Sequence, residues 1–217
     1  MILVSRHMKI LVTAGPTREA LDPVRFLSNR STGKMGYAVA EAAQRRGHRV
    51  TLVSGPVVLE TPSGVERVDV VTAAEMCDAV LARLEACDVL VMAAAVSDWR
   101  PADVSTRKRK KGEMPDALRL ERTPDILAAA APFKQGRLYV GFAAETGNPE
   151  AEAARKLKEK SLDLIVANDV LDPEAGFAVD TNRVTLIDIA GDVRRLPAMP
   201  KTAVALDLVD RITRLWQ

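Results

Sequence analysis

Short apolar runs alternate with helix-like segments along most of this chain, and the alternation leaves few folds open to it. The apolar runs are rich in β-branched residues, and helical spacing of apolar residues separates several of them. Strands joined by helices pair in parallel through right-handed crossovers. The alternation therefore predicts an α/β fold with a Rossmann-like, mostly parallel sheet and helices on both faces. The predicted strands cover residues 9–14, 49–53, 65–71, 88–94, 137–143 and 162–167.

Capping signals mark the ends of the predicted helices. Thr72 and Glu75 have the spacing of a capping box, in which each side chain accepts a hydrogen bond from a free N–H at the helix start. Gly47 is typical of the residue that follows a helix, and Asn148 and Pro149 suit an N-cap and a first helical position. The predicted helices cover residues 33–46, 72–86, 149–160 and 202–215.

Two stretches depart from the alternation. Residues 101–121 are basic and poor in helix signals, and their last residues alternate in polarity, so they are expected to form a strand-bearing flap that leaves the sheet. Residues 182–188 and 193–196 alternate polar and apolar side chains on either side of a turn at Gly191. This pattern predicts an antiparallel hairpin on the edge of the sheet.

One domain, over residues 9–217, is expected for a chain of this length with 47% hydrophobic residues. Residues 1–8 are expected to be a vector remnant and the start of the protein. The sequence has no apolar run of about 18 residues and no signal-peptide pattern, so a cytoplasmic protein without membrane contact is expected. Cys77 and Cys87 lack a zinc or redox spacing and are expected to be free thiols.

The sequence lacks the common nucleotide-binding motifs and contains few histidines. A phosphate loop would need glycine at Ser28 and serine or threonine at Met35, and no G-x-G-x-x-G follows the first strand. This weakens a nicotinamide-dependent reductase without excluding it. Only His7 and His48 are present, which argues against a histidine-based nucleophile triad or a histidine-ligated metal.

Residues 26–36 connect the first predicted strand to the first predicted helix, where open α/β sheets usually bind ligands. Ser28 and Asn29 offer neutral hydrogen bonds, and Arg25 and Lys34 offer positive charge. A ligand-binding segment is therefore predicted here, and a solvated loop with a few charges is the alternative.

Two later strand ends offer further binding groups. Residues 93–95 are alanines that would let a planar group approach the backbone, and Asp98 could bind a sugar, a base or a divalent ion. Phe142 could stack on a base, although core packing suits it better on its own, and Lys156 and Lys160 lie one helical turn apart. The alternatives are close packing of the alanines and a turn cap at Asp98.

Residues 107–111 form the basic run Arg-Lys-Arg-Lys-Lys within the expected flap. The net charge of +2 argues against a general polyanion binder, and no aromatic residue interleaves with the run, which argues against nucleic acid as a partner. Such a run is suited to fold over a triphosphate and neutralise charge on a leaving pyrophosphate. A solvated charge cluster is the alternative.

Six motifs, in one order along the chain, carry a resemblance to a known family. They are Ala-Gly-Pro-Thr-Arg-Glu (14–19), Ser-Asn-Arg-Ser-Thr-Gly-Lys-Met-Gly (28–36), Ala-Ala-Val-Ser-Asp-Trp-Arg-Pro (94–101), Lys-x-Lys-Lys (108–111), Gly-Phe-Ala-Ala-Glu-Thr (141–146) and Ala-Asn-Asp-Val (167–170). From about residue 9 to near the C-terminus the chain resembles phosphopantothenoylcysteine synthetases, also called phosphopantothenate cysteine ligases, of coenzyme A biosynthesis.

The resemblance implies a two-step ligation. The carboxylate of 4′-phosphopantothenate attacks the α-phosphate of CTP, which gives an acyl-cytidylate and pyrophosphate, and the amine of cysteine then displaces CMP. The resemblance also implies Mg²⁺ and a homodimer formed through added strands. In the common bacterial arrangement a flavin-dependent decarboxylase precedes the synthetase, and a fusion of that kind implies a higher oligomer. The decarboxylase is absent here, so a stand-alone enzyme or an excised C-terminal domain is expected.

The resemblance also implies roles for individual residues. Asn29 and Lys108 would be catalytic, and Arg25 and Ser28 would bind substrate with Asn29. Asp98 would be the metal ligand. The nucleotide would be bound by Ala93, Ala94, Ala95, Asp98, Lys108, Val140, Gly141, Phe142, Ala143, Lys156 and Lys160.

Two other functions stay open at this point. One is an NAD(P)-dependent Rossmann-type reductase, and the other is a non-enzymatic module that binds a nucleotide or nucleic acid through the flap. The residues themselves do not distinguish CTP from ATP; only the resemblance implies CTP.

Overall fold

The computed structural model describes residues 7–113, 116–145, 149–169, 171–172, 175–176 and 179–217. The predicted vector remnant lies outside these residues except for residues 7 and 8, and so does the predicted N-cap Asn148. Among the described residues, no helix is long and apolar enough to cross a membrane.

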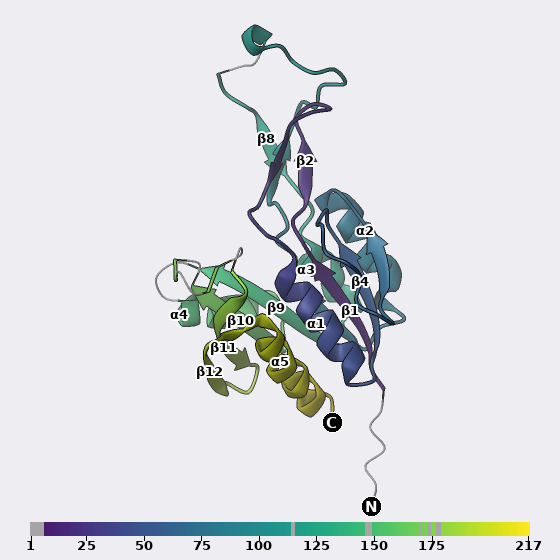
Figure 1. The fold of residues 1–217 in the computed structure, drawn as a ribbon, viewed down its shortest axis with the longest axis vertical. Coiled ribbons are helices and arrows are strands. Elements are labelled where there is room, and N and C mark those ends of the chain that lie inside the picture. The colour runs from purple at the N-terminus through teal and green to yellow at the C-terminus, as the bar shows by residue number, and fades with distance from the viewer. Residues whose placement is uncertain (1–6, 114–115, 146–148, 170, 173–174, 177–178) are drawn as a thin grey trace, which may run out of the picture.

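A single eight-stranded sheet forms the centre of the molecule (Figure 1). Its strands are β1 (Lys9–Ala14), β4 (Arg49–Ser54), β5 (Glu66–Asp69), β6 (Val89–Met92), β9 (Leu138–Glu145), β10 (Leu164–Asp169), β11 (Thr181–Asp188) and β12 (Val193–Pro200). They lie in the order β12-β11-β10-β9-β6-β1-β4-β5. The pairs from β10 to β5 are parallel, and β11 and β12 are antiparallel. The Rossmann-like fold and the antiparallel edge hairpin are therefore confirmed.

The strand order reverses between β1 and β6, which pair directly. From β1 the chain moves outward through β4 to β5, and it then returns to β6 and proceeds through β9 to β10 on the other side. This is the arrangement of a doubly wound sheet, in which ligands bind beyond the carboxyl ends of the strands at the reversal.

Helices cover both faces of the sheet (Figure 1). The helices are α1 (Lys34–Arg45), α2 (Ala73–Leu84), α3 (Ile126–Ala130), α4 (Pro149–Glu159) and α5 (Lys201–Trp216). One core joins α1 and α5 to side chains such as Val12 and Val91, and the other joins α2, α3 and α4 to side chains such as Leu11 and Leu90. Neighbouring strand residues thus enter opposite cores, as the two-residue period of a strand requires.

Local sequence signals explain most helix boundaries. Thr72 Oγ1 accepts a hydrogen bond from Glu75 N at 3.1 Å, and Glu75 Oε2 accepts one from Thr72 N at 3.4 Å, which confirms the capping box of α2. Cys77 and Cys87 are buried free thiols, as predicted, and burial raises the pKa of Cys87 to about 11.

Two hairpins leave the sheet together and form a projection that we call the arm. One hairpin pairs β2 (Arg18–Ala20) with β3 (Phe26–Ser28), and the other pairs β7 (Trp99–Pro101) with β8 (Leu120–Arg122). Figure 1 shows β2 and β8 standing above the sheet, with the flap beyond them. The predicted flap is confirmed, and the segment of residues 26–36 begins with the short strand β3, which argues against the alternative of a solvated loop at its start.

Helix α1 packs unusually closely on the central strand. A Cβ atom added to Gly36 would lie 2.6 Å from Cβ of Ala14 and 2.9 Å from the carbonyl oxygen of Thr13. Only glycine lets the start of α1 approach β1 to this distance, and the approach holds the preceding loop over the end of the strand.

We predict that Gly36→Ala destabilises the fold. Relieving the contact requires α1 or β1 to move, and such overpacking costs about 1–3 kcal/mol of unfolding free energy, measurable by urea denaturation. Gly112→Ala is the control, because no other atom lies within 4 Å of its added Cβ atom. A Gly36→Ala variant as stable as the parent would contradict the close packing of α1 on β1.

Candidate functional site

The pairing of β1 with β6 continues past the ends of both strands. Ala95 N donates to the carbonyl of Gly15 at 2.9 Å, and Ser97 N donates to the buried Thr17 Oγ1 at 3.0 Å. Pro16 and Ala95 form a parallel bridge between these two bonds. The backbone that follows β6 is therefore held alongside the backbone that follows β1, at the point where the strand order reverses.

A cavity of about 940 Å³ lies at this reversal point. That volume is within the range of small-molecule binding sites. Its walls come from the loop before α1, the end of β6, the segment before α3, and the ends of β9, β10 and α4. The lining residues are 29–36, 92–96, Asp98, 122–127, Phe142, Ala144, Lys156, Lys160, Asn168, Gly176, Asn182 and Lys201.

Asn29 ties the loop before α1 to the end of β6. Its Nδ2 donates to the carbonyls of Ala95 at 3.0 Å and Val96 at 3.1 Å. Ser28 Oγ donates instead to the carbonyl of Thr17 at 2.7 Å, so Ser28 supports the loop from the arm side. Among the described residues, the amide oxygen of Asn29 accepts no hydrogen bond.

The N-terminus of α1 faces the same cavity. Its N-cap is Gly33, which has no side chain to satisfy the first N–H groups, and Gly33 to Gly36 all line the wall. Unsatisfied N–H groups and the helix dipole both favour an anion at this position.

Four lysines line the cavity, and carboxylates hold three of them. Lys34 pairs with Asp180 at 2.6 Å, Lys156 pairs with Glu145, and Lys160 pairs with Asp125. These three lysines are part-exposed, so an anionic ligand could draw them away from their carboxylates.

The carboxylate at Asp125 and the ammonium at Lys201 respond differently to burial. Burial acts to raise the pKa of Asp125, but hydrogen bonds from Lys160 and from the N–H of Ala128 outweigh it, so the pKa is lowered. Lys201 is buried and donates to the carbonyls of Gly176, Val179 and Thr181, and burial lowers its pKa. Lys201 therefore holds this part of the wall in place.

One wall was missed by the sequence analysis. Residues 122–127 also line the cavity, and Thr123 Oγ1 holds them there by donating to the carbonyl of Ser97 at 2.5 Å. Asp125 caps the short helix α3 by accepting a hydrogen bond from Ala128 N at 3.1 Å. The Thr-Pro-Asp sequence before the apolar residues of α3 was a usable signal for this helix start.

The structure gathers most of the predicted site residues around one cavity and leaves others outside it. Asn29, Ala93, Ala94, Ala95, Asp98, Phe142, Lys156 and Lys160 all line the wall. The residues that do not line it are Arg25, Ser28, Lys108, Val140, Gly141 and Ala143.

The residues outside the wall have three different surroundings. Lys108 is exposed on the flap, and Arg25 lies at the far end of the β2–β3 hairpin, where it pairs with Asp22. Val140 and Ala143 are 1% exposed and belong to the two cores. A Cβ atom on Gly141 would lie 2.5 Å from Leu162 Cδ1, so close packing accounts for this glycine.

A metal ion would find few protein ligands here. Within the described ranges no three His, Cys, Asp or Glu side chains cluster in a way that could hold one. The exposed Asp98 and the lysine-paired Asp125 are the carboxylates of the wall. One or two carboxylates fit Mg²⁺ that is bound mainly through the phosphates of a nucleotide and does not fit a metal held by protein alone.

Comparison with known proteins identifies the family. The sequence profile described as "DNA/pantothenate metabolism flavoprotein C-terminal domain" matches residues 5–215. The coenzyme A biosynthesis bifunctional protein CoaBC of Bacillus subtilis (strain 168) is 49% identical over 207 residues, and the protein of that name from Escherichia coli (strain K12) is 49% identical over 211 residues. Each alignment covers 95% of this chain, and it covers 51% and 52% of the two relatives, so the chain spans about half their length.

A solved structure agrees with the sequence relatives. The crystal structure of the C-terminal domain of a CoaBC protein superimposes with a TM-score of 0.82 at 42% identity, and the alignment covers 96% of this chain and 95% of that one. The resemblance inferred from the motifs is thus confirmed, and the reductase alternative is not favoured. The chain belongs to the family of DNA/pantothenate metabolism flavoprotein C-terminal domains.

Proposed function

We propose that this domain is a phosphopantothenate cysteine ligase of coenzyme A biosynthesis, which joins 4′-phosphopantothenate to cysteine through an acyl-cytidylate. One observation carries the proposal. Four of the six motifs that carry the family resemblance, although far apart in the sequence, contribute residues to a single cavity at the reversal point of the sheet. The family membership and the CoaBC relatives support the same assignment.

The first step needs neutralised charge more than it needs a base. A carboxylate oxygen of phosphopantothenate bonds to the α-phosphorus of CTP, and the bond from that phosphorus to the β-phosphate oxygen breaks to release pyrophosphate. The attacking carboxylate is already ionised near neutral pH, since carboxyl pKa values are about 4. Lysines and free N–H groups around the cavity suit the charge that develops on the phosphates.

In the second step the neutral amine of cysteine bonds to the acyl carbon. The bond from that carbon to the nucleotide phosphate breaks, CMP leaves, and the amine releases one proton. Asn29 is positioned for this step, because its Nδ2 is committed to Ala95 and Val96 while its amide oxygen is available to the acyl group. The site has no histidine in its lining, which agrees with chemistry that works by charge and position.

The nucleotide would lie along the wall that carries Phe142, Lys156 of α4 and Lys160, which directly follows α4. Phe142 would contact the base or the sugar, and Lys156 and Lys160 would leave Glu145 and Asp125 for the phosphates. Asp98 would help to hold a Mg²⁺ ion that binds with the nucleotide phosphates, and the ion would supply further charge neutralisation. Lys108 would reach the phosphates from the flap.

A homodimer formed through the arm is part of the proposal. Six large apolar side chains are exposed on the two hairpins and the flap, a concentration that favours a protein interface. They are Val24, Phe26, Trp99, Val104, Leu118 and Leu120. Each partner would cover these side chains of the other. The free thiols of Cys77 and Cys87 agree with a cytoplasmic enzyme.

Pyrophosphate release tests the proposal. We predict that the domain releases pyrophosphate only when CTP, Mg²⁺ and 4′-phosphopantothenate are present together, and that cysteine is required for CMP but not for one turnover of pyrophosphate. An enzyme-coupled pyrophosphate assay with each component omitted in turn measures this, and ATP replaces CTP in one arm. Absence of release with either nucleotide would refute the ligase.

The lysines of α4 provide a second test with a matched control. We predict that Lys156→Met weakens binding of CTP about tenfold, because a charge-assisted contact to phosphate is worth about 1.5–3 kcal/mol. Lys158→Met removes the same charge from the same helix but does not line the cavity, so its affinity should match the parent. Titration calorimetry measures both, and equal losses in the two variants would remove Lys156 from the site.

A further inference from the structure

Asp22 is a buried carboxylate at the far end of the β2–β3 hairpin, away from the cavity. Its side chain has 0% exposure. Its Oδ1 accepts hydrogen bonds from Val24 N and Arg25 N, both at 2.9 Å, which closes the turn that joins β2 to β3. An aspartate often stabilises a turn in this way, so Oδ1 alone would mark Asp22 as a turn residue.

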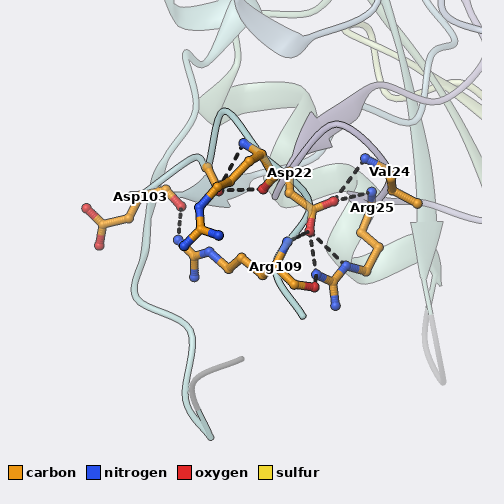
Figure 2. Close-up of polar contacts among 7 residues, drawn as sticks. Asp22, Val24, Arg25, Asp103 and Arg109 are labelled. Atoms are coloured by element: carbon orange, nitrogen blue, oxygen red, sulfur yellow. Dashed lines mark hydrogen bonds and ion pairs between the residues drawn. The ribbon is translucent and has the colours of Figure 1, made fainter. Parts of the chain in front are cut away.

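The other oxygen of Asp22 reaches outside its own hairpin. Oδ2 accepts hydrogen bonds from the Arg25 side chain, at 3.0 Å from Nε, and from the backbone N–H of Arg109 at 3.3 Å. Arg25 Nη2 in turn donates to the carbonyl of Arg109 at 3.0 Å. Figure 2 shows the Asp22 carboxylate between the Arg25 guanidinium and the backbone of Arg109.

Arg109 lies in the middle of the basic run of the flap, next to Lys108. Both backbone polar groups of Arg109 are therefore bound to the Asp22–Arg25 pair. A second contact, from Ser105 N to the carbonyl of Leu21 at 3.1 Å, holds the same stretch of the flap against the hairpin turn. Because these contacts involve backbone atoms of the flap, they fix the path of the chain through the basic run.

We propose that Asp22 is a positioning residue. By binding the backbone of Arg109 it fixes the basic run of the flap, and it thereby places Lys108 for its contact with the nucleotide. The inference rests on the proposed function, because that function gives Lys108 its task at the nucleotide phosphates. Asp22 does not line the cavity and is not proposed to touch a substrate. It acts through Arg25 and the backbone of Arg109, while strand β3 of the same hairpin leads directly to Asn29 on the cavity wall.

The ionised state of the Asp22 carboxylate makes its contact with the flap strong. The guanidinium of Arg25 holds the pKa of the Asp22 carboxyl well below its usual range, with further help from the backbone donors. The carboxylate therefore stays charged at any pH at which the domain would work. Hydrogen bonds to an ionised acceptor are stronger than those between neutral groups.

Asp22→Asn separates the two roles of this side chain. The variant keeps an oxygen for the turn N–H groups, but the new amide nitrogen cannot accept from Arg25 or from Arg109. We expect the amide hydrogen of Arg109 to exchange at least about tenfold faster, as the loss of a charge-assisted bond implies. Hydrogen exchange with mass spectrometry, on a peptide that contains Arg109, measures this in the full chain without any substrate.

Two further variants make the exchange experiment decisive. Asp103→Asn is the control. Among the described residues its exposed carboxylate pairs with Arg119, and its backbone carbonyl, which accepts from Arg109 Nη2 at 3.4 Å, is kept in the variant, so the exchange should stay unchanged. Arg25→Gln keeps both turn bonds of Asp22 and should speed the exchange even if Asp22→Asn does not fold. Unchanged exchange in the folded Asp22→Asn and Arg25→Gln variants would overturn the proposal.

A double-mutant cycle tests whether Asp22 acts through Lys108. We expect Lys108→Gln to lower kcat about 100-fold or more, and Asp22→Asn to lower kcat at least about tenfold with the melting temperature nearly kept. In the Lys108→Gln background, Asp22→Asn should change kcat less than about twofold. The first substitution has already removed the ammonium group of Lys108 that Asp22 is proposed to position. Independent, multiplying losses would contradict positioning of Lys108.

The two experiments separate failure of this inference from failure of the proposed function. If exchange accelerates in Asp22→Asn while the parent domain releases no pyrophosphate, the role of Asp22 in holding the flap is supported and the ligase assignment fails. If the parent releases pyrophosphate and the exchange stays unchanged, the ligase stands and the role of Asp22 fails.

Discussion

The structure depends on the pairing between β1 and β6, which continues beyond the sheet through Pro16 and Ala95. Both hairpins of the arm begin at this continued pairing, the first after β1 and the second after β6. The cavity lies next to this continued pairing. Asn29 binds the segment after β6 through two hydrogen bonds, to Ala95 and Val96. The backbone at the reversal of strand order thus forms one side of the site, and the arm begins next to it.

Charge around the cavity is balanced at short range. Lys34, Lys156 and Lys160 each have a carboxylate partner, whereas the first N–H groups of α1 have no side-chain cap. A polyphosphate can bind by replacing the carboxylates as partners of the lysines, which lets the site bind a strong anion without carrying a large uncompensated charge. Mg²⁺ fits this scheme, because the phosphates, and not the protein, would supply most of its ligands.

The sequence predicted the sheet, its edge hairpin and the flap, because apolar periodicity and capping signals are local. It missed β2, β3, β7 and α3, which are three to five residues long and depend on tertiary contacts such as that of Thr123 with Ser97. It also predicted most of the cavity wall, since parallel strands end at a shared edge. It could not reveal that Asp22 binds a flap residue 87 positions away, because nothing local in the sequence specifies such a contact.

In the proposed reaction, the phosphopantothenate carboxylate attacks the α-phosphate of CTP in this cavity. Phosphopantothenate labelled with ¹⁸O in its carboxylate tests it most directly, in a reaction with CTP, Mg²⁺ and cysteine followed by mass spectrometry of the products. We expect one labelled oxygen in the phosphate of CMP, because attack by cysteine cleaves the bond between the acyl carbon and that oxygen. Unlabelled CMP, with the label in inorganic phosphate or pyrophosphate, would contradict the acyl-cytidylate and the role given to the cavity.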